Sequence, residues 1–224
     1  MSTIVLDPGH GGLSRVDGSS PSNATGVGGT KEKDLTLEIG LDVARLLRQR
    51  GHTVLLTRET DINLALSARA RVAATRKADA FLSIHFNAFE DTSVQGTEVQ
   101  LHRAASARSR LLGKTVLRRT VEATGYRDRG LRTGQWGVLD PTVHDPATAA
   151  CLVEVSFLTH PPEEERLRNF AYKRQIAQAL ADGVQDYLDG AVGFSRTLAA
   201  VESGVLKTLH LIQPSQTQRA DRHE

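Results

Sequence analysis

Two spacings of apolar residues alternate along most of the chain. Apolar runs of strand length occupy residues 3–6, 52–57, 80–86, 97–101 and 151–156. Between them, apolar residues recur every three or four positions, as on one helix face, over about 34–50, 66–77, 104–124 and 171–188. Strands that alternate with helices predict an α/β domain with a largely parallel sheet that helices cover on both faces.

Stretches with neither spacing predict the loops. Residues 11–30 are rich in Gly, Ser, Asn and Thr and predict a long loop, which in a compact domain is commonly functional or disordered. Residues 125–147 are rich in turn-forming residues and predict irregular structure. Asp34 is the expected N-cap of the first helix, and Gly51 is expected to end it.

The periodic pattern weakens after residue 190. Residues 192–211 fit one more helix, and the polar residues 213–224 predict a disordered tail. We therefore predict one domain over residues 1–190, followed by a C-terminal extension over residues 191–224 that is partly helical and then disordered.

Composition excludes several classes of protein. With 39% hydrophobic and 24% charged residues, the 224-residue chain has the balance of an ordinary globular domain. A net charge of +2, with no basic run interleaved with aromatics, gives no reason to expect a nucleic-acid partner. No apolar run has the length of a membrane span. The single cysteine, Cys151, excludes a disulfide within the chain, and we expect it to serve packing alone.

Four polar residues lie where an α/β sheet is expected to place a ligand site. In α/β sheets, ligands bind beyond the carboxyl ends of the strands. His10 follows the first strand in IVLDPGHGG, His85 lies near the end of AFLSIHF, and Glu154 interrupts the apolar run CLVEVSFL. Glu32, in GTKEKDL, lies between the long loop and the first helix.

These residue types match the chemistry of a hydrolytic zinc site. Two histidines and a carboxylate with an open fourth position form a common ligand set of catalytic zinc, and His10, Glu32 and His85 could supply it. Glu154 would then take a proton from the metal-activated water and return it to a leaving amine. A carboxylate within a buried strand is costly to desolvate, which favours a specific role for Glu154 over the exposed glutamates.

Each candidate also has an ordinary structural interpretation. His85 could be a hydrogen-bonded core histidine, and Glu32 a solvated acid favoured by the helix dipole. Glu154 could instead pair with Arg58 or Arg69. The spacing of these residues leaves the alternatives open.

Two further groups of polar residues have structural interpretations. Asp7, beside Pro8, is expected to be a turn former or an outer partner of a ligand histidine. The run Glu163 to Glu165 is expected to be a solvated helix start.

Several motifs, in their order along residues 3–188, resemble the zinc-dependent N-acetylmuramoyl-L-alanine amidases of the amidase-3 class. The motifs are IVLDPGHGG, EKDLTLEIG, SIHFNA and LVEVSFLTHPPEEERL. The resemblance implies one domain with a mixed, mostly parallel sheet of about six strands between helices. It also implies that His10, Glu32 and His85 bind zinc and that Glu154 is catalytic.

The same resemblance implies the substrate and its setting. The expected reaction is hydrolysis of the amide between N-acetylmuramic acid and the L-alanine of the peptidoglycan stem peptide, by a chain that we expect to be monomeric. The N-terminus lacks the regions of a signal peptide. We therefore expect synthesis in the cytoplasm and release to the cell wall by another route, as for a phage lysin or a secreted antibacterial effector, unless a leader was removed.

Two other functions make different demands on these four residues. A zinc-dependent peptidase of stem peptides would use the same four residues. A non-catalytic wall-binding module would be expected to lack a metal ligand or the base, whereas all four are present.

Some positions near the implied site match the family pattern and others depart from it. The resemblance places Asn87 in the lining of the site and includes the pair Arg129–Gly130, for which it implies no role. The chain has SFLTH where the family commonly has a G-F-L-S-N sequence, and residues 131–150 are less typical. This segment is expected to border the cleft, so Trp136 and His144 are candidates for tuning substrate choice.

Overall fold

The computed structural model describes the backbone of residues 1–211 and the side chains of residues 1–191. The chain divides into a compact unit, residues 1–188, and a second unit, residues 189–224. The elements, in chain order, are β1 (Thr3–Pro8), α1 (Glu32–Gln49), β2 (Thr53–Leu56), α2 (Leu66–Thr75), β3 (Ala80–Asn87), β4 (Thr97–His102), α3 (Ala107–Thr124), β5 (Asp128–Gly134), the 3-10 turn η1 (Gly137–Leu139), β6 (Ala149–Phe157), α4 (Pro161–Leu167) and α5 (Phe170–Leu211).

Six strands form one sheet in the order β2-β1-β3-β6-β4-β5. Four of the five strand pairs are parallel, and β4 pairs antiparallel to β6. The predicted mixed, mostly parallel sheet of about six strands is therefore confirmed. β5 lies within the segment that was expected to be irregular, so that expectation is wrong for residues 128–134. Its half-exposed position at the sheet edge explains why it lacks an apolar run.

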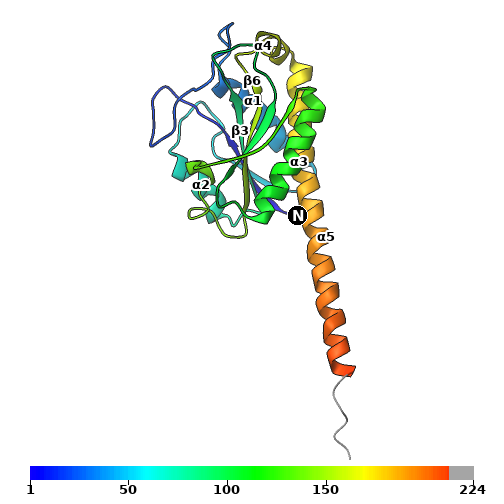
Figure 1. Ribbon diagram of the computed structural model, residues 1–224. Helices are drawn as coiled ribbons and strands as arrows, with labels where there is room; N and C mark the ends of the chain where they lie inside the picture. Colours follow the sequence, from blue (N-terminus) through cyan, green and yellow to red (C-terminus); the bar gives the residue numbers. More distant parts are fainter. Residues whose placement is uncertain (212–224) are drawn as a thin grey trace, which may run out of the picture. The chain divides into compact units, whose positions relative to one another are not determined.

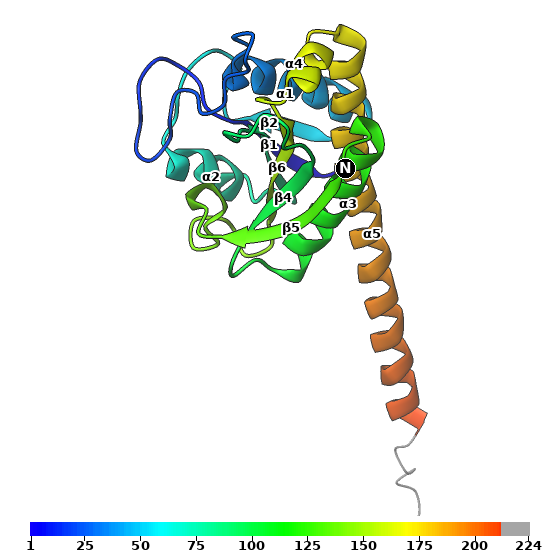
Figure 2. The same cartoon turned by 45° about the horizontal axis from the view of Figure 1, so that its top comes forward.

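Helices cover both faces of the sheet, as predicted (Figure 1). On one face, α2 and η1 pack on the sheet around Val5, Phe81 and Leu152. On the opposite face, α3 lies beside the first part of α5 (Figure 2). A Cβ at Gly183 of α5 would lie 2.7 Å from Val116 Cα of α3, so glycine permits this close approach.

The carboxyl ends of the central strands deliver polar side chains to the α2 face. Strand register places His85 of β3 opposite Glu154 of β6, and Glu154 opposite Glu98 of β4. Since paired residues in a sheet share a face, these three side chains emerge together. They lie at the sheet end where a ligand site is expected.

Two glutamates of α4 are buried, and one of them holds the long loop of residues 11–31 to the domain. Glu164 of α4 is 3% exposed and accepts hydrogen bonds from the amides of Gly28 and Thr30. Glu163 is fully buried and accepts from the hydroxyl of Ser156. The helix start expected at these glutamates is present in α4, but the expectation that it is solvated is wrong for both.

Two boundary predictions also change. The first helix begins at Glu32 and its N-cap residue is Lys31, so Asp34 lies inside the helix. The helix expected over residues 192–211 is present as the continuation of α5. The tail predicted at 213–224 lies outside the described residues. Within the described residues, none of the helices combines the length and the apolar character that crossing a bilayer requires.

Candidate active site

His10 is held in position by the turn that follows β1. Its backbone is left-handed, with φ of 60°, and Gly11 follows with φ of 128°. A Cβ at Gly11 would lie 2.0 Å from the Ile62 carbonyl oxygen, so this turn requires glycine. His10 Nδ1 donates to the Ser20 carbonyl at 2.9 Å. This bond places a proton on Nδ1 and directs Nε2, which is buried, at the Glu32 carboxylate 3.2 Å away.

Glu32 is 1% exposed and lies between the two histidines. Its Oε1 is 2.9 Å from His85 Nδ1 and 3.2 Å from His10 Nε2. Its Oε2 accepts from the amide of Ala24 at 2.8 Å, and Oε1 also accepts from the amide of Phe86. Burial raises the pKa of Glu32, but the two histidines outweigh burial and hold the pKa far below its ordinary value. Glu32 is therefore ionised, and the solvated-acid interpretation is wrong.

His85 completes the cluster from the end of β3. Its ring is half-buried and lies against Gly9, where a Cβ would approach three ring atoms at 2.3 to 2.7 Å. The His10 and His85 rings meet edge to face with centroids 4.8 Å apart. Gly9 thus provides the space in which the His85 ring reaches Glu32.

The three side chains fit a zinc ion. Their candidate ligand atoms all lie within 4.8 Å of one another. Ligands about 2.1 Å from a tetrahedral zinc are about 3.4 Å apart, somewhat more than the 3.2 Å and 2.9 Å that separate Glu32 Oε1 from the nearest nitrogens of His10 and His85. An ionised carboxylate and an imidazole nitrogen with no hydrogen-bond partner are the donors that zinc takes. The cluster predicted from the sequence, His10, Glu32 and His85, is thus assembled.

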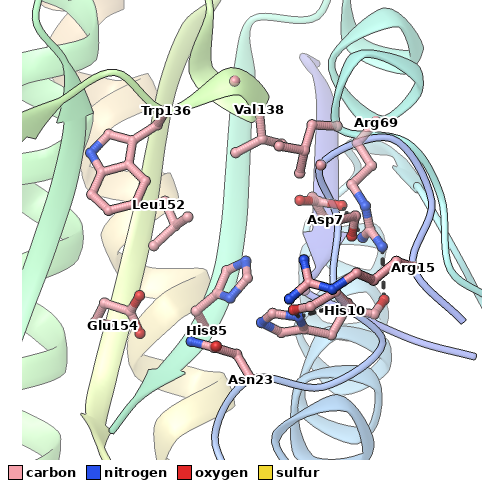
Figure 3. Close-up of a pocket in the computed structure, with 16 residues that line it drawn as sticks. Asp7, His10, Arg15, Asn23, Arg69, His85, Trp136, Val138, Leu152 and Glu154 are labelled. Atoms are coloured by element: carbon pink, nitrogen blue, oxygen red, sulfur yellow. Dashed lines mark hydrogen bonds and ion pairs between the residues drawn. The ribbon is translucent and has the colours of Figure 1, made fainter. Parts of the chain in front are cut away.

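Glu154 lies across the pocket from His10, with His85 between them (Figure 3). Its Oε2 is buried and has no hydrogen-bond partner. Burial raises the pKa of Glu154 well above 4.5, and the carboxylates of Glu32 and Glu98 raise it further. Glu154 as a whole is half-buried, but a carboxyl with a raised pKa and an enclosed, unpartnered oxygen can accept and hold a proton.

Neither arginine suggested as a partner of Glu154 pairs with it. Arg58 donates to the backbone carbonyls of Pro8, Gly9, Thr60 and Lys33. Arg69 forms its ion pair with Asp7. It is the neighbouring acid, Glu98, that pairs with an arginine. Arg129 Nε donates to Glu98 Oε2 at 2.8 Å. This ion pair gives the Arg129–Gly130 motif a structural role.

A cavity of about 330 Å³ opens over these residues. Trp136 lines it, as expected, whereas His144 donates to the Val138 carbonyl and lines a separate, smaller cavity. Asn87, expected in the site lining, donates to Glu98 instead. The loop adds five lining residues that the sequence did not single out: Arg15, Gly18, Ser19, Ser20 and Asn23. Their only signal was the length of the loop.

Comparison with known proteins agrees with this geometry. The family model described as N-acetylmuramoyl-L-alanine amidase matches residues 4–186. The chain belongs to this amidase family. The N-acetylmuramoyl-L-alanine amidase LytC of Bacillus subtilis is 33% identical over 186 residues, which cover 83% of this chain and 35% of LytC. AmiA of Escherichia coli is 28% identical, with 82% of this chain and 75% of AmiA covered.

Solved amidase structures share the fold of the domain. The catalytic domain of CwlV from Bacillus (Paenibacillus) polymyxa aligns with a TM-score of 0.74 at 34% identity, covering 84% of this chain and 99% of that domain. An N-acetylmuramoyl-L-alanine amidase from Clostridium difficile 630 aligns with a TM-score of 0.74 at 32% identity, covering 84% and 97%. This chain spans about a third of LytC and about half of AmiC from Neisseria meningitidis.

In this member of the amidase family, an ion pair beneath the cavity holds the backbone of His10. Arg69 Nη1 donates to Asp7 Oδ1 at 2.9 Å, and Arg69 Nη2 donates to the His10 carbonyl at 2.8 Å. The hydroxyls of Thr57 and Ser83 donate to the Asp7 carboxylate. Asp7 therefore acts on His10 through Arg69 and the backbone. Asp7 lies within β1, so the turn-former expectation is wrong, whereas the contacts agree with an outer partner of His10 that acts through Arg69.

Replacing Asp7 by asparagine is expected to lower the free energy of unfolding by about 3–5 kcal/mol at pH 7, because it leaves the buried Arg69 charge uncompensated. Burial raises the pKa of Asp7, but Arg69 and the Ser83 and Thr57 hydroxyls outweigh burial and lower the pKa below 3.8. A lowered carboxyl pKa stabilises the fold above the unfolded-state pKa, and this stabilisation is lost as the pH falls through the folded-state value.

Urea unfolding of Asp7→Asn and wild type at pH 7 and pH 3 measures both effects, and the difference should be smaller at pH 3. Asp42→Asn is the matched control, because Asp42 pairs with Arg45 at the surface and should cost less than about 1 kcal/mol. Equal losses in the two variants would contradict the role given to Asp7.

Proposed function

We propose that this chain is a zinc-dependent N-acetylmuramoyl-L-alanine amidase that acts on peptidoglycan. The reaction is hydrolysis of the amide between N-acetylmuramic acid and the L-alanine of the stem peptide. One observation carries the proposal: in a chain of this family, two members of the His10, Glu32 and His85 cluster, the histidines, line the same cavity as the unpartnered Glu154. We propose residues 1–190 as the catalytic domain and residues 191–224 as an extension of it, and the cell wall as the place of action.

Three side chains would hold the metal. Zinc bound there would polarise a carbonyl and lower the pKa of its water to about 7. His10 offers Nε2, since its Nδ1–H is engaged by the Ser20 carbonyl. Glu32 offers negative charge and keeps its orientation through the amides of Ala24 and Phe86. These bonds orient the ligand atoms before a metal arrives.

Glu154 would move the proton in both halves of the reaction. As a base it accepts a proton from the attacking water, whose oxygen forms a bond with the amide carbon. It then gives that proton to the amide nitrogen as the carbon–nitrogen bond breaks. The products are the lactyl carboxylate of muramic acid and a stem peptide with a free L-alanine amine. The burial that raises the pKa of Glu154 favours the proton-holding state between these steps.

Mass spectrometry of digested peptidoglycan tests the proposed bond. We expect stem peptides that begin with a free L-alanine amine, no such products after treatment with a chelator, and their return when zinc is added. A new amine between two stem residues would instead indicate the zinc peptidase. Absence of both products, with zinc present, would contradict the proposed function.

A further inference from the structure

The two sides of the active-site cavity differ in chemistry. Trp136 and Leu152 lie on the side of Glu154, and Arg15 lies on the side of His10 (Figure 3). Gly134 makes room for the indole, because a Cβ there would lie 2.7 Å from Trp136 Nε1. The cavity therefore has an apolar, aromatic side and a cationic side, with the candidate metal ligands between them.

Arg15 is a free cation, unlike the other arginine of this cavity. All three guanidinium nitrogens of Arg69 are hydrogen-bonded, to Asp7, to Asn63 and to backbone carbonyls. Within the part of the chain that the structure describes, Arg15 has neither an ion-pair nor a hydrogen-bond partner. A guanidinium with five unused donors in a cavity is suited to a carboxylate, which it can bind through two parallel hydrogen bonds.

The cavity leaves this positive charge uncompensated. Asp7, which also lines it, is neutralised by Arg69 at 2.9 Å. Glu154 is on the opposite side of the cavity from Arg15 (Figure 3). A doubly charged zinc held by His10, Glu32 and His85 would exceed the single negative charge of Glu32, so the His10 side would carry net positive charge. This side therefore favours an anionic part of the substrate.

We propose that Arg15 binds the free α-carboxylate of the second stem residue, a glutamate linked through its γ-carboxyl. The inference rests on the proposed amidase function. The second residue is within about 7 Å of the cleaved bond, since a chain spans at most about 3.6 Å per residue, and a cavity of about 330 Å³ accommodates groups this near. The stem peptide then extends toward Arg15, and muramic acid lies toward Trp136. Arg15 thereby selects stems with this carboxylate free over stems in which it is amidated.

The test compares two muramyl tetrapeptides that differ only in this group, one with the free α-carboxylate and one with the α-amide, both with lysine as the third residue. Wild type should cleave the acid with the higher kcat/KM. Arg15→Gln should lower kcat/KM for the acid about 10- to 100-fold, the size expected for a charged hydrogen-bonded pair, and change it less than about 3-fold for the amide. Arg15→Lys should retain part of the preference, because it keeps the charge but loses the bidentate geometry.

Two further variants and a third substrate serve as controls for this experiment. Arg132→Gln, at an exposed arginine of β5 outside the cavity lining, should leave both substrates unchanged. Trp136→Leu should lower kcat/KM for both substrates alike. A third substrate, the acid with an amidated C-terminus, should behave as its parent, since the terminal carboxylate is not the group that Arg15 binds.

Each other outcome overturns the inference. Equal loss on all three substrates in Arg15→Gln would place Arg15 at the cleaved bond, and no loss on any of them would remove it from substrate binding. Loss on both the acid and the α-amide, with none on the substrate with an amidated C-terminus, would assign Arg15 to the terminal carboxylate. If wild type releases no L-alanyl peptide from either tetrapeptide, the proposed function itself fails, which is a different result from a lack of preference.

Discussion

Replacing Glu154 by glutamine is expected to lower kcat by about 10²- to 10⁴-fold, the usual contribution of a general acid–base group. Glutamine has nearly the same shape but cannot accept the proton of water. Zinc content should stay at the wild-type level, because Glu154 is not among the three clustered ligands. The free energy of unfolding should not fall, since Glu154 Oε2 has no partner to lose and the change removes a carboxylate from beside Glu98.

This combination separates a catalytic role from a structural one. Activity on a muramyl peptide, zinc by mass spectrometry and urea unfolding are measured on the same preparation. Glu122→Gln is the control, because Glu122 forms only exposed pairs with Arg118 and Arg119 on α3. A Glu154→Gln enzyme with full activity would remove Glu154 from the mechanism, and one that has lost its zinc would make Glu154 part of the metal site.

The architecture was predictable where burial imposes a regular pattern. The central strands β1, β3 and β6 are buried on both faces, and each was visible as an apolar run. The edge strand β5, with sequence DRGLRTG, has polar residues and two glycines because part of it faces solvent. β5 joins the sheet through backbone pairing with β4, and such pairing does not require a pattern of apolar side chains.

The candidate site was predictable in identity but not in its supports. His10 and His85 were candidates because they lie at strand ends and Glu154 because it interrupts an apolar run, and the family resemblance implied the roles of these three residues and of Glu32. The burial of Glu32 depends on the amides of Ala24 and Phe86, which are 8 and 54 residues away, and sequence spacing cannot show such contacts.

The charge of an acid does not by itself show whether the residue is exposed. Glu163 and Glu164 begin a helix, where acids are commonly solvated, yet both are buried on partners elsewhere in the chain. The position of Arg15 likewise follows from the path of the 11–31 loop. Pattern predicts which segments form the core, whereas the partners of buried charges depend on the assembled tertiary structure.

Replacing His85 by alanine is expected to abolish hydrolysis and to weaken zinc binding by at least about 100-fold, since even outer partners of metal ligands contribute 10- to 100-fold. The variant loses one of three donors, and the remaining pair, His10 and Glu32, cannot complete the set. Its fold should persist, because the His85 ring is 16% exposed and lies at the end of β3 rather than in the core.

Thermal unfolding with and without zinc distinguishes loss of the metal from loss of the fold. A ligand that binds only the folded state raises the melting temperature, so zinc should stabilise wild type and leave His85→Ala unchanged. His52→Ala is the control: His52 precedes β2 and contacts Gln185 rather than the cluster, so zinc should stabilise it as it does wild type. A His85→Ala protein that zinc still stabilises to the wild-type extent would show that the metal lies elsewhere, and the hydrolytic centre proposed at His10, Glu32 and His85 would have to be abandoned.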